Sequence, residues 1–198
     1  SRDELVELLF AKLGRERGRA NLRRTLSYLR NAIGENRLGT DRLSAWLTNT
    51  SNDSLDVTEF LRLVNNLRNT PENPLARENR LARAVQLYRG DFFSGFYVKD
   101  SFAFEEWQLM LHDDLRSRQA VALRQLSDIH CERNQYEQAI EFGRRWLRLD
   151  RLEEAAHRQL MELYSLAGRH TEALRQYEEC RSLLEKGLGE YPAEETER

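Results

Sequence analysis

Residues 153–192 read EEAAHRQLMELYSLAGRHTEALRQYEECRSLLEKGLGEYP, and at a shift of 34 residues they repeat the apolar pattern of the segment before them. Leu126 falls on Leu160, and residues 138–140 (QAI) fall on residues 172–174 (EAL). Self-similarity at such a period indicates helical hairpins that stack and bury one face on each other. Further matched pairs are His130 with Tyr164, Asn134 with Gly168, Gly143 with Tyr177 and Trp146 with Cys180.

The period and the small residue at the centre of each unit resemble the tetratricopeptide repeat. Ala139 and Ala173 stand where the two antiparallel helices of one repeat touch. Arg151 occupies the position where this repeat usually has proline, so the first unit is atypical. We expect repeats at about 120–151 and 154–188, with surfaces that bind partners rather than a catalytic site.

Helical patterns also precede the repeats. Residues 56–59 (DVTE) have the spacing of a capping box ahead of a helix through Leu67, and a turn-rich connector follows at 69–74. The next helix is expected from Leu75 to Tyr88, with Gly90 closing it.

An aromatic loop follows Gly90. Its aromatic side chains form either an exposed adhesive patch or a buried plug between helices. We expect burial, because aromatic rings supply large buried areas. The residues concerned are Phe92, Phe93, Phe96 and Tyr97.

The N-terminal quarter differs in charge from the rest. Residues 1–50 hold ten Lys and Arg against six Asp and Glu, a net charge of +4, whereas the whole chain has −2. A basic end on an acidic body is typical of a nucleic-acid contact confined to one end, although four charges also arise by chance.

Two helices and a hairpin are expected within this basic quarter. Ser1 and Glu4 form a capping box, Gly14 ends the first helix, and residues 14–18 (GRERG) join it to a helix from about Gly18 to Ile33. One side of the second helix is apolar, and the opposite side is cationic and polar, as in helices that enter the major groove of DNA. The apolar side holds Leu22, Leu26, Leu29 and Ile33; the opposite side holds Arg24, Ser27, Tyr28 and Asn31, with Arg23 and Arg30 flanking.

Two short strands are expected around a turn at residues 40–42, with Leu43, Ala45 and Leu47 on one face. A helix followed by a hairpin whose turn carries Arg42 is the layout of a winged helix. An amphipathic surface helix followed by an ordinary hairpin is the other interpretation.

The motifs of several protein classes are absent from the sequence. It contains no HExxH, CxxC, GxxxxGK or GxGxxG motif and no nucleophile elbow, so we predict neither an enzyme nor a metal or other cofactor. No apolar run approaches the roughly 20 residues of a membrane span. We interpret Cys131 and Cys180 as reduced thiols of a cytoplasmic protein. His130 and His157 are expected inside the repeats as hydrogen-bonded imidazoles.

The order of parts resembles bacterial transcriptional activator domain proteins of the antibiotic-regulatory-protein type, in which a winged helix precedes a tetratricopeptide-like helical domain. Residues 1–10 (SRDELVELLF) are similar to that family's second winged-helix helix, and residues 20–34 (ANLRRTLSYLRNAIG) to its recognition helix. Residues 55–64 (LDVTEFLRLV) are similar to the entry into the activator domain, and Leu-Gly-x-x-Pro at 188–192 is a family habit. The family's winged helix begins with a β-sheet and a first helix, which we expect to precede Ser1.

The resemblance implies a mainly α fold, with part of a winged helix-turn-helix at 1–55 and a helical activator domain at 56–198. It implies a DNA-binding activator of transcription that contacts RNA polymerase, a second copy of the chain or other domains through its repeats. Promoter DNA would be double-stranded, with the wing arginine beside the minor groove. The DNA-contacting residues would be Arg19, Arg23, Arg24, Thr25, Ser27, Tyr28, Arg30, Asn31 and Arg42.

Two other functions remain open. One is a protein-interaction scaffold whose repeats bind partners while the N-terminal part binds no DNA; the other is a sensor with a small molecule in the repeat groove. DNA binding is favoured if Arg24, Tyr28 and Arg30 share an exposed face with Arg42, and the scaffold if Tyr28 and Arg30 are packed away.

Overall fold

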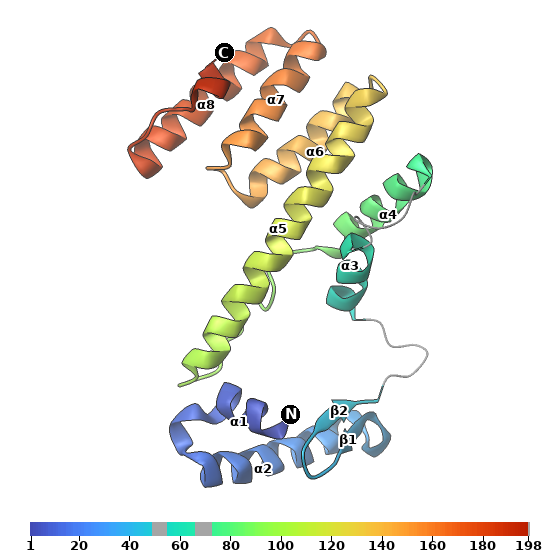
Figure 1. Cartoon of the computed structure of the whole chain (residues 1–198), viewed down its shortest axis with the longest axis vertical. Coiled ribbons are helices and arrows are strands. Elements are labelled where there is room, and N and C mark those ends of the chain that lie inside the picture. Colours follow the sequence, from blue (N-terminus) through green and yellow to red (C-terminus); the bar gives the residue numbers. More distant parts are fainter. Residues whose placement is uncertain (49–54, 66–72, 198) are drawn as a thin grey trace. The chain divides into compact units, whose positions relative to one another are not determined.

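A computed structural model describes residues 1–48, 55–65 and 73–197, and it is mostly helical with one small hairpin, as predicted (Figure 1). The described chain divides into two compact units. The first unit comprises residues 1–55 and 90–114, and the second comprises 56–89 and 115–198. The sequence did not indicate that residues 90–114 belong with the first unit.

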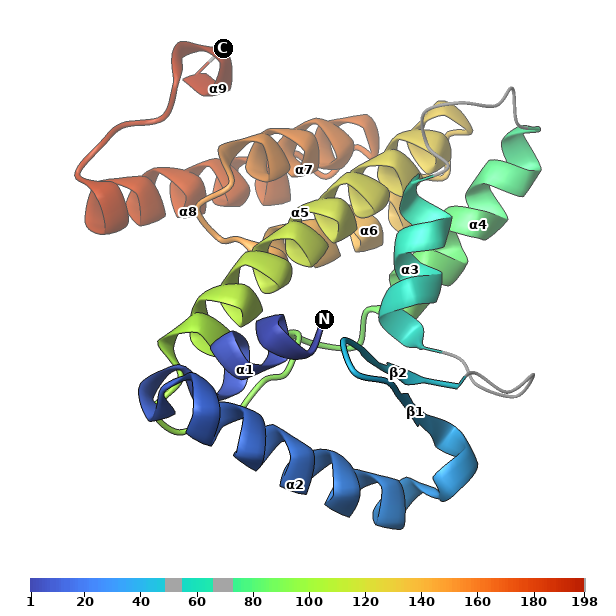
Figure 2. The same ribbon diagram turned by 60° about the horizontal axis from the view of Figure 1, so that its bottom comes forward.

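The first unit begins with two helices and a hairpin, drawn in blue in Figures 1 and 2. Ser1 and Glu4 form the predicted capping box at the start of the first helix. The strands are antiparallel, with Leu38 opposite Leu47 and Thr40 opposite Ala45. The elements are α1 (Arg2–Phe10), η1 (Ala11–Leu13), α2 (Arg15–Ile33), η2 (Glu35–Arg37), β1 (Leu38–Thr40) and β2 (Ala45–Leu47).

The expected start of the second helix is wrong by about one turn. Helix α2 begins at Arg15, and the chain reverses at Gly14, whose φ of 69° favours glycine. Gly18 therefore lies inside the helix, where it allows α1 and α2 to approach each other closely. A Cβ at Gly18 would lie 2.6 Å from Cγ1 of Val6, so the glycine is a packing residue rather than a linker.

The expected apolar faces are only partly covered. On α2, Leu22 is buried and Leu26 half-buried, whereas Leu29 and Ile33 are exposed. In the hairpin, Leu43 belongs to the turn rather than to a strand, and both Leu43 and Leu47 are exposed. The buried strand residue is Leu38, which forms the core of this part together with Val6 and Leu22.

The segment 90–114 contributes the aromatic loop and the start of helix α5 (Phe102–Glu132) to the first unit. Lys12 Nζ lies 2.9 Å from Asp100 Oδ1, and the Ser101 hydroxyl donates a hydrogen bond to the Leu8 carbonyl. The predicted burial of the loop aromatics is wrong for Phe93, Phe96 and Tyr97, which are exposed, while Phe92 is half-buried. Their rings do not plug a joint; instead Phe93 and Phe96 lean on each other and on Phe104.

The second unit contains the remaining helices. They are α3 (Asp56–Asn65), α4 (Pro74–Leu87), the rest of α5, α6 (Tyr136–Leu149), α7 (Glu154–Leu166), α8 (His170–Leu188) and the short α9 (Glu194–Glu197). Asn73 caps α4 through a hydrogen bond from the Leu75 amide. The predicted end of α3 at Leu67 and the connector at 69–74 lie mostly outside the described residues.

The internal repeat is confirmed by the backbone. Asn134 and Gly168, which the 34-residue shift superposes, both turn the chain with left-handed φ values, 58° and 73°. Leu126 and Leu160 are both fully buried, as are Ala139 and, nearly so, Ala173. Helices α6, α7 and α8 pack in succession (Figures 1 and 2). The pattern breaks at one pair: Ile140 is buried, whereas Leu174 is 69% exposed on α8.

The polar residues inside the repeats have the expected partners. His157 is buried; its Nε2 donates to the Arg151 carbonyl oxygen at 3.0 Å, and its Nδ1 accepts from Gln176 at 2.7 Å. His130 is half-buried against Phe142 and lies 2.8 Å from Gln135 Oε1. Both cysteines are free thiols, and burial raises the pKa of Cys180 to about 11, which keeps it protonated.

None of the helices in the described ranges combines the length and the apolar character that a membrane crossing requires.

Candidate nucleic-acid interface

The outward face of α2 is exposed and rich in groups that form hydrogen bonds. Tyr28 is 68% exposed, and Arg24 and Asn31 share its side of the helix at spacings of four and three residues. Thr25 and Ser27 flank this face and are exposed as well. Guanidinium, amide, hydroxyl and phenol groups on one face are the groups that contact base edges and phosphates.

Arg17 belongs to the same face and was missed in the sequence. It lies seven residues before Arg24, so the two side chains are almost aligned on α2. It was left out because the helix was expected to begin at Gly18. Within the described ranges, neither Arg17 nor Arg24 has an ion-pair partner, so both charges face solvent.

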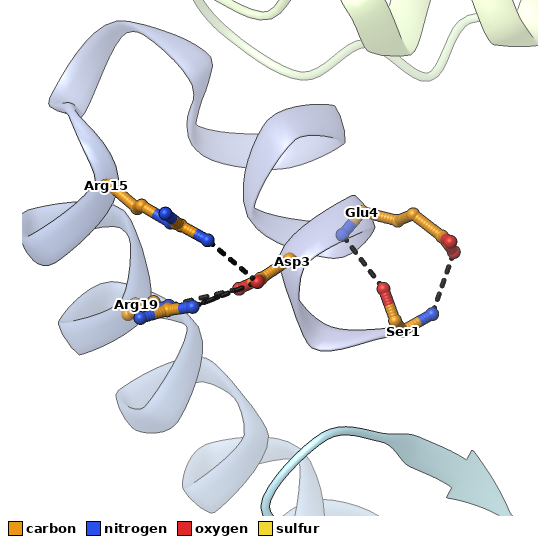
Figure 3. Close-up of polar contacts among 5 residues, drawn as sticks. All are labelled: Ser1, Asp3, Glu4, Arg15 and Arg19. Carbon is orange, nitrogen blue, oxygen red and sulfur yellow. Dashed lines mark hydrogen bonds and ion pairs between the residues drawn. The ribbon is translucent and has the colours of Figure 1, made fainter.

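Arg19 is held by an intramolecular ion pair. Its guanidinium grips the carboxylate of Asp3 with Nε–Oδ1 at 3.0 Å and Nη2–Oδ2 at 2.9 Å, and Arg15 approaches the same carboxylate at 3.3 Å (Figure 3). The hydrogen bond from Arg19 is the main reason that the pKa of Asp3 is lowered. Arg19 thus links α1 to α2, and its charge is largely matched before any DNA arrives.

Arg30 is likewise turned away from the outward face. Its Nη2 donates to Thr40 Oγ1 at 2.7 Å, and the side chain is half-buried between the end of α2 and strand β1. This contact orients the hairpin against the helix. Of the three α2 residues chosen to distinguish the functions, Arg24 and Tyr28 are exposed, and Arg30 is packed against the hairpin.

The hairpin turn is built to present Arg42. Asp41 Oδ1 accepts hydrogen bonds from the amides of Ser44, at 2.6 Å, and Leu43, at 2.7 Å, and these two bonds are the main reason that its pKa is lowered. Arg2 ties the turn to α1, since its amide donates to the Leu43 carbonyl and its Nη1 to the Asp41 carbonyl. Arg42 itself is exposed and has no ion-pair partner in the part of the chain that the structure describes.

A basic hollow lies between the start of α1, the middle of α2 and the hairpin turn. It has a volume of about 700 Å³, and Arg2, Arg23 and Arg42 line it beside the Asp3–Arg19 pair. Leu22 and Leu43 supply its apolar lining. The hollow brings Arg23 and Arg42, which lie far apart in the sequence, to one side of the unit.

No metal centre is built from the described residues, among which no group of three or more His, Cys, Asp and Glu side chains has suitable geometry. The candidate nucleic-acid interface consists of the exposed face of α2, the basic hollow and the hairpin turn that carries Arg42.

The helical part of the chain matches a known protein family. The model of the bacterial transcriptional activator domain matches residues 55–198, well over half of the chain. The chain belongs to this family. The resemblance inferred from the sequence is thereby confirmed, and the activator domain coincides with the helical part that carries the repeats.

One solved structure extends the similarity over both units. Mycobacterium tuberculosis EmbR, solved in complex with a low-affinity phosphopeptide, matches with a TM-score of 0.70 and 18% sequence identity. The match covers 100% of this chain and 52% of the EmbR chain, so the activator-domain chain spans about half the length of EmbR. At this identity the similarity establishes the fold. A search of curated proteins finds no match.

Proposed function

We propose that this member of the bacterial transcriptional activator domain family is a DNA-binding activator of transcription. The single observation that carries the proposal is the exposed, polar and unpaired outward face of α2, next to a hairpin turn that presents Arg42. The family match supports a role in transcription, and the arrangement of helices and hairpin in the first unit supports binding to double-stranded promoter DNA. Such a regulator acts in the cytoplasm, where the bacterial chromosome lies.

The outward face supplies the contacts that discriminate between bases. We infer that Arg24, Tyr28 and Asn31 enter the major groove. Arg17, Thr25 and Ser27 would contact the edges of the groove. Arginine forms a bidentate pair with guanine and asparagine one with adenine, each contributing about 1–3 kcal/mol of discrimination. Because base contacts set specificity, a change at Arg24 should affect the cognate site more than random DNA.

The remaining arginines divide into phosphate contacts and structural contacts. Arg23 and Arg42 face the basic hollow and are placed for the phosphate backbone, with Arg42 near the minor groove. Arg19 and Arg30 are engaged by Asp3 and Thr40, so we assign them to holding α1 and the hairpin on α2. This assignment refines the set expected from the sequence, in which all four contact DNA.

The helical repeats are the protein-contacting part in this proposal. RNA polymerase, a second copy of the chain or a further domain are the candidate partners, since stacked repeats provide surfaces of this kind. A scaffold that binds no DNA is the alternative, and the test below separates the two.

Fluorescence anisotropy of the full-length protein with promoter DNA from its own gene neighbourhood tests the proposal at two salt concentrations. We expect tight binding that weakens steeply with salt and retains a preference over random duplex. Arg24→Ala should lower cognate affinity about tenfold and random-sequence affinity less, following the loss of one bidentate pair. Arg175→Ala, an exposed arginine of α8, is the matched control and should change neither. The absence of cognate binding at both salt concentrations would refute DNA recognition and favour the scaffold.

A further inference from the structure

A groove in the second unit carries its own set of arginines. It has a volume of about 350 Å³ and is lined by α6, α7, α8 and the link after α6. Arg144, Arg148 and Arg151 line it together with Tyr164, and Glu179 stands on the α8 side. The partly buried Leu147 provides apolar surface within the same groove, which the fully buried Leu160 also borders.

The spacing along α6 separates the groove arginines from a neighbour with a different role. Arg144 and Arg148 are four residues apart and therefore lie on one side of α6. Arg145 points away from the groove, because its Nη2 donates to the Val85 carbonyl oxygen at 3.3 Å. Burial at that position lowers the pKa of the Arg145 guanidinium. The three basic residues of this helical turn are thus divided between packing and the groove.

Contacts within the groove hold Arg144 on Tyr164, engage Arg151 with Glu179 and leave Arg148 available. Arg144 Nε donates to Tyr164 Oη at 2.9 Å, and its guanidinium carbon lies 5.6 Å from the centre of that ring. Its two terminal NH₂ groups have no acceptor among the described residues. Arg148 is exposed and forms no ion pair within the described ranges, whereas Arg151 reaches Glu179 at 3.2 Å.

We propose that this groove binds an acidic segment of a partner protein. Carboxylates of the segment pair with Arg144 and Arg148. Arg144 is held by Tyr164, so it loses little side-chain entropy when it forms bidentate bonds, and Arg148 supplies a second guanidinium four residues away. An apolar side chain of the same segment rests on Leu147. The proposal adds a partner chemistry to the protein-contacting role of the repeats, and it does not depend on DNA binding by the first unit.

Charge complementarity favours a polypeptide over a nucleic acid as the occupant. A duplex needs an extended basic surface, since its phosphates form a continuous line of charge. Here Glu179 lines the groove, and Glu178 and Glu185 are exposed on the same helix. These carboxylates repel a polyanion, whereas a short acidic segment places its few charges on the arginines alone.

The test uses the full-length protein and a fluorescein-labelled peptide of alternating glutamate and leucine. A glutamine–leucine peptide serves as the uncharged control. We expect saturable binding of the acidic peptide that weakens with salt and weaker or no binding of the control. Binding of both peptides with equal affinity, or of neither, would overturn the proposal.

Two double variants of equal charge place the peptide on the groove. Arg144→Gln/Arg148→Gln should weaken peptide binding about tenfold, as loss of charge-assisted bonds does, while Arg175→Gln/Arg181→Gln on α8 should leave it within about twofold. Arg148→Gln alone, which removes no hydrogen bond or ion pair among the described residues, should weaken binding about threefold and guards against unfolding of the double variant. Equal losses in the two double variants would show nonspecific attraction and refute the groove.

Promoter DNA measured on the same variants separates this proposal from the first. The groove variants should bind DNA as the wild type does. A parallel loss of DNA affinity would mean that the groove contacts nucleic acid and would overturn the acidic-segment proposal. Loss of DNA binding in every protein, with the peptide result intact, would refute only DNA recognition.

Discussion

The two units are stabilised by different kinds of contact. In the repeats, Ala139, Leu160 and Leu163 are almost completely buried and form one continuous apolar cluster with their neighbours. In the first unit the apolar core of α1, α2 and the hairpin is small, with Val6, Leu22 and Leu38 as its buried residues. The repeats are thus held by packing, and the basic unit depends more on individual contacts.

Polar links join the elements of the first unit to one another. The Asp3–Arg19 pair joins α1 to α2, Arg30 joins α2 to the hairpin, and Arg2 joins α1 to the turn. Two of these links use arginines, Arg19 and Arg30, that the sequence indicates as DNA contacts. The number of arginines therefore overstates the surface available to DNA, because Arg19 and Arg30 hold the helices and the hairpin together.

The largest effect is expected in the repeat core. Leu160→Ala should lower the free energy of unfolding of the second unit by about 2–5 kcal/mol, because it leaves a cavity between α6 and α7. The loss is measured by urea unfolding, with the hydrogen exchange of the α7 amides as the readout. Leu174→Ala removes the same atoms from an exposed site and should cost less than about 0.5 kcal/mol. Similar costs at both positions would contradict the difference in packing.

The next effect concerns the close approach of α1 and α2. Gly18→Ala should destabilise the first unit by about 1–3 kcal/mol, because the new methyl group would overlap the stiff side chain of Val6. Alanine also favours the helix by about 1 kcal/mol, so the clash is partly offset. Hydrogen exchange of α2 measures the balance.

A second substitution isolates the clash at Gly18. Val6→Ala removes the methyl groups that the new Cβ would meet, so the double variant should recover part of the loss caused by Gly18→Ala. If Gly18→Ala stabilises α2 on its own, the close contact of the helices is refuted.

Much of the fold could be predicted from periodicity. The 34-residue repeat located the helices of the second unit, because apolar positions that face a core recur at helical spacing. The exposure of Leu174 could not be predicted. An apolar repeat position indicates a surface that can pack on a neighbouring helix, but the pattern does not show whether a helix covers that position. The predicted burial of the loop aromatics was wrong for a related reason. A cluster of Phe residues indicates that the rings contact one another, but it does not show whether another surface covers them.

The candidate site could be predicted as a face but not residue by residue. The helical angle placed Arg24, Tyr28 and Asn31 outward, as the structure has them. It could not reveal that Arg19 meets Asp3 or that Arg30 meets Thr40, because those partners come from other elements. Arg17 was missed because the start of α2 was expected three residues too late. The signal in the sequence that could have corrected this is Gly14, since glycine is the residue that adopts the positive φ found between the two helices.

The link between α2 and the hairpin gives a smaller effect. Thr40→Val keeps the shape of the side chain and removes the acceptor of Arg30 Nη2, which should cost about 1 kcal/mol. The loss should appear as faster hydrogen exchange in β1 and β2. Thr25→Val on the exposed side of α2 is the matched control and should leave exchange in the hairpin unchanged. Equal exchange in the two variants would mean that Arg30 does not position the hairpin.

The smallest effect is expected at Asp3, whose ion pair with Arg19 is exposed to solvent. Its pKa is lowered in the folded state, so its contribution is fully present above the ordinary value of 3.8 and is lost as the pH falls through the lower folded value. Asp3→Asn should therefore melt slightly below the wild type at pH 7, and this difference should disappear as the pH falls through that folded value. Glu7→Gln on the same helix is the matched control, because it removes one carboxylate that has no ion-pair partner among the described residues. A difference that persists with Asp3 fully protonated would assign the effect to helix propensity at the start of α1 rather than to the ion pair, and Arg19 would then return to the set of arginines available to DNA.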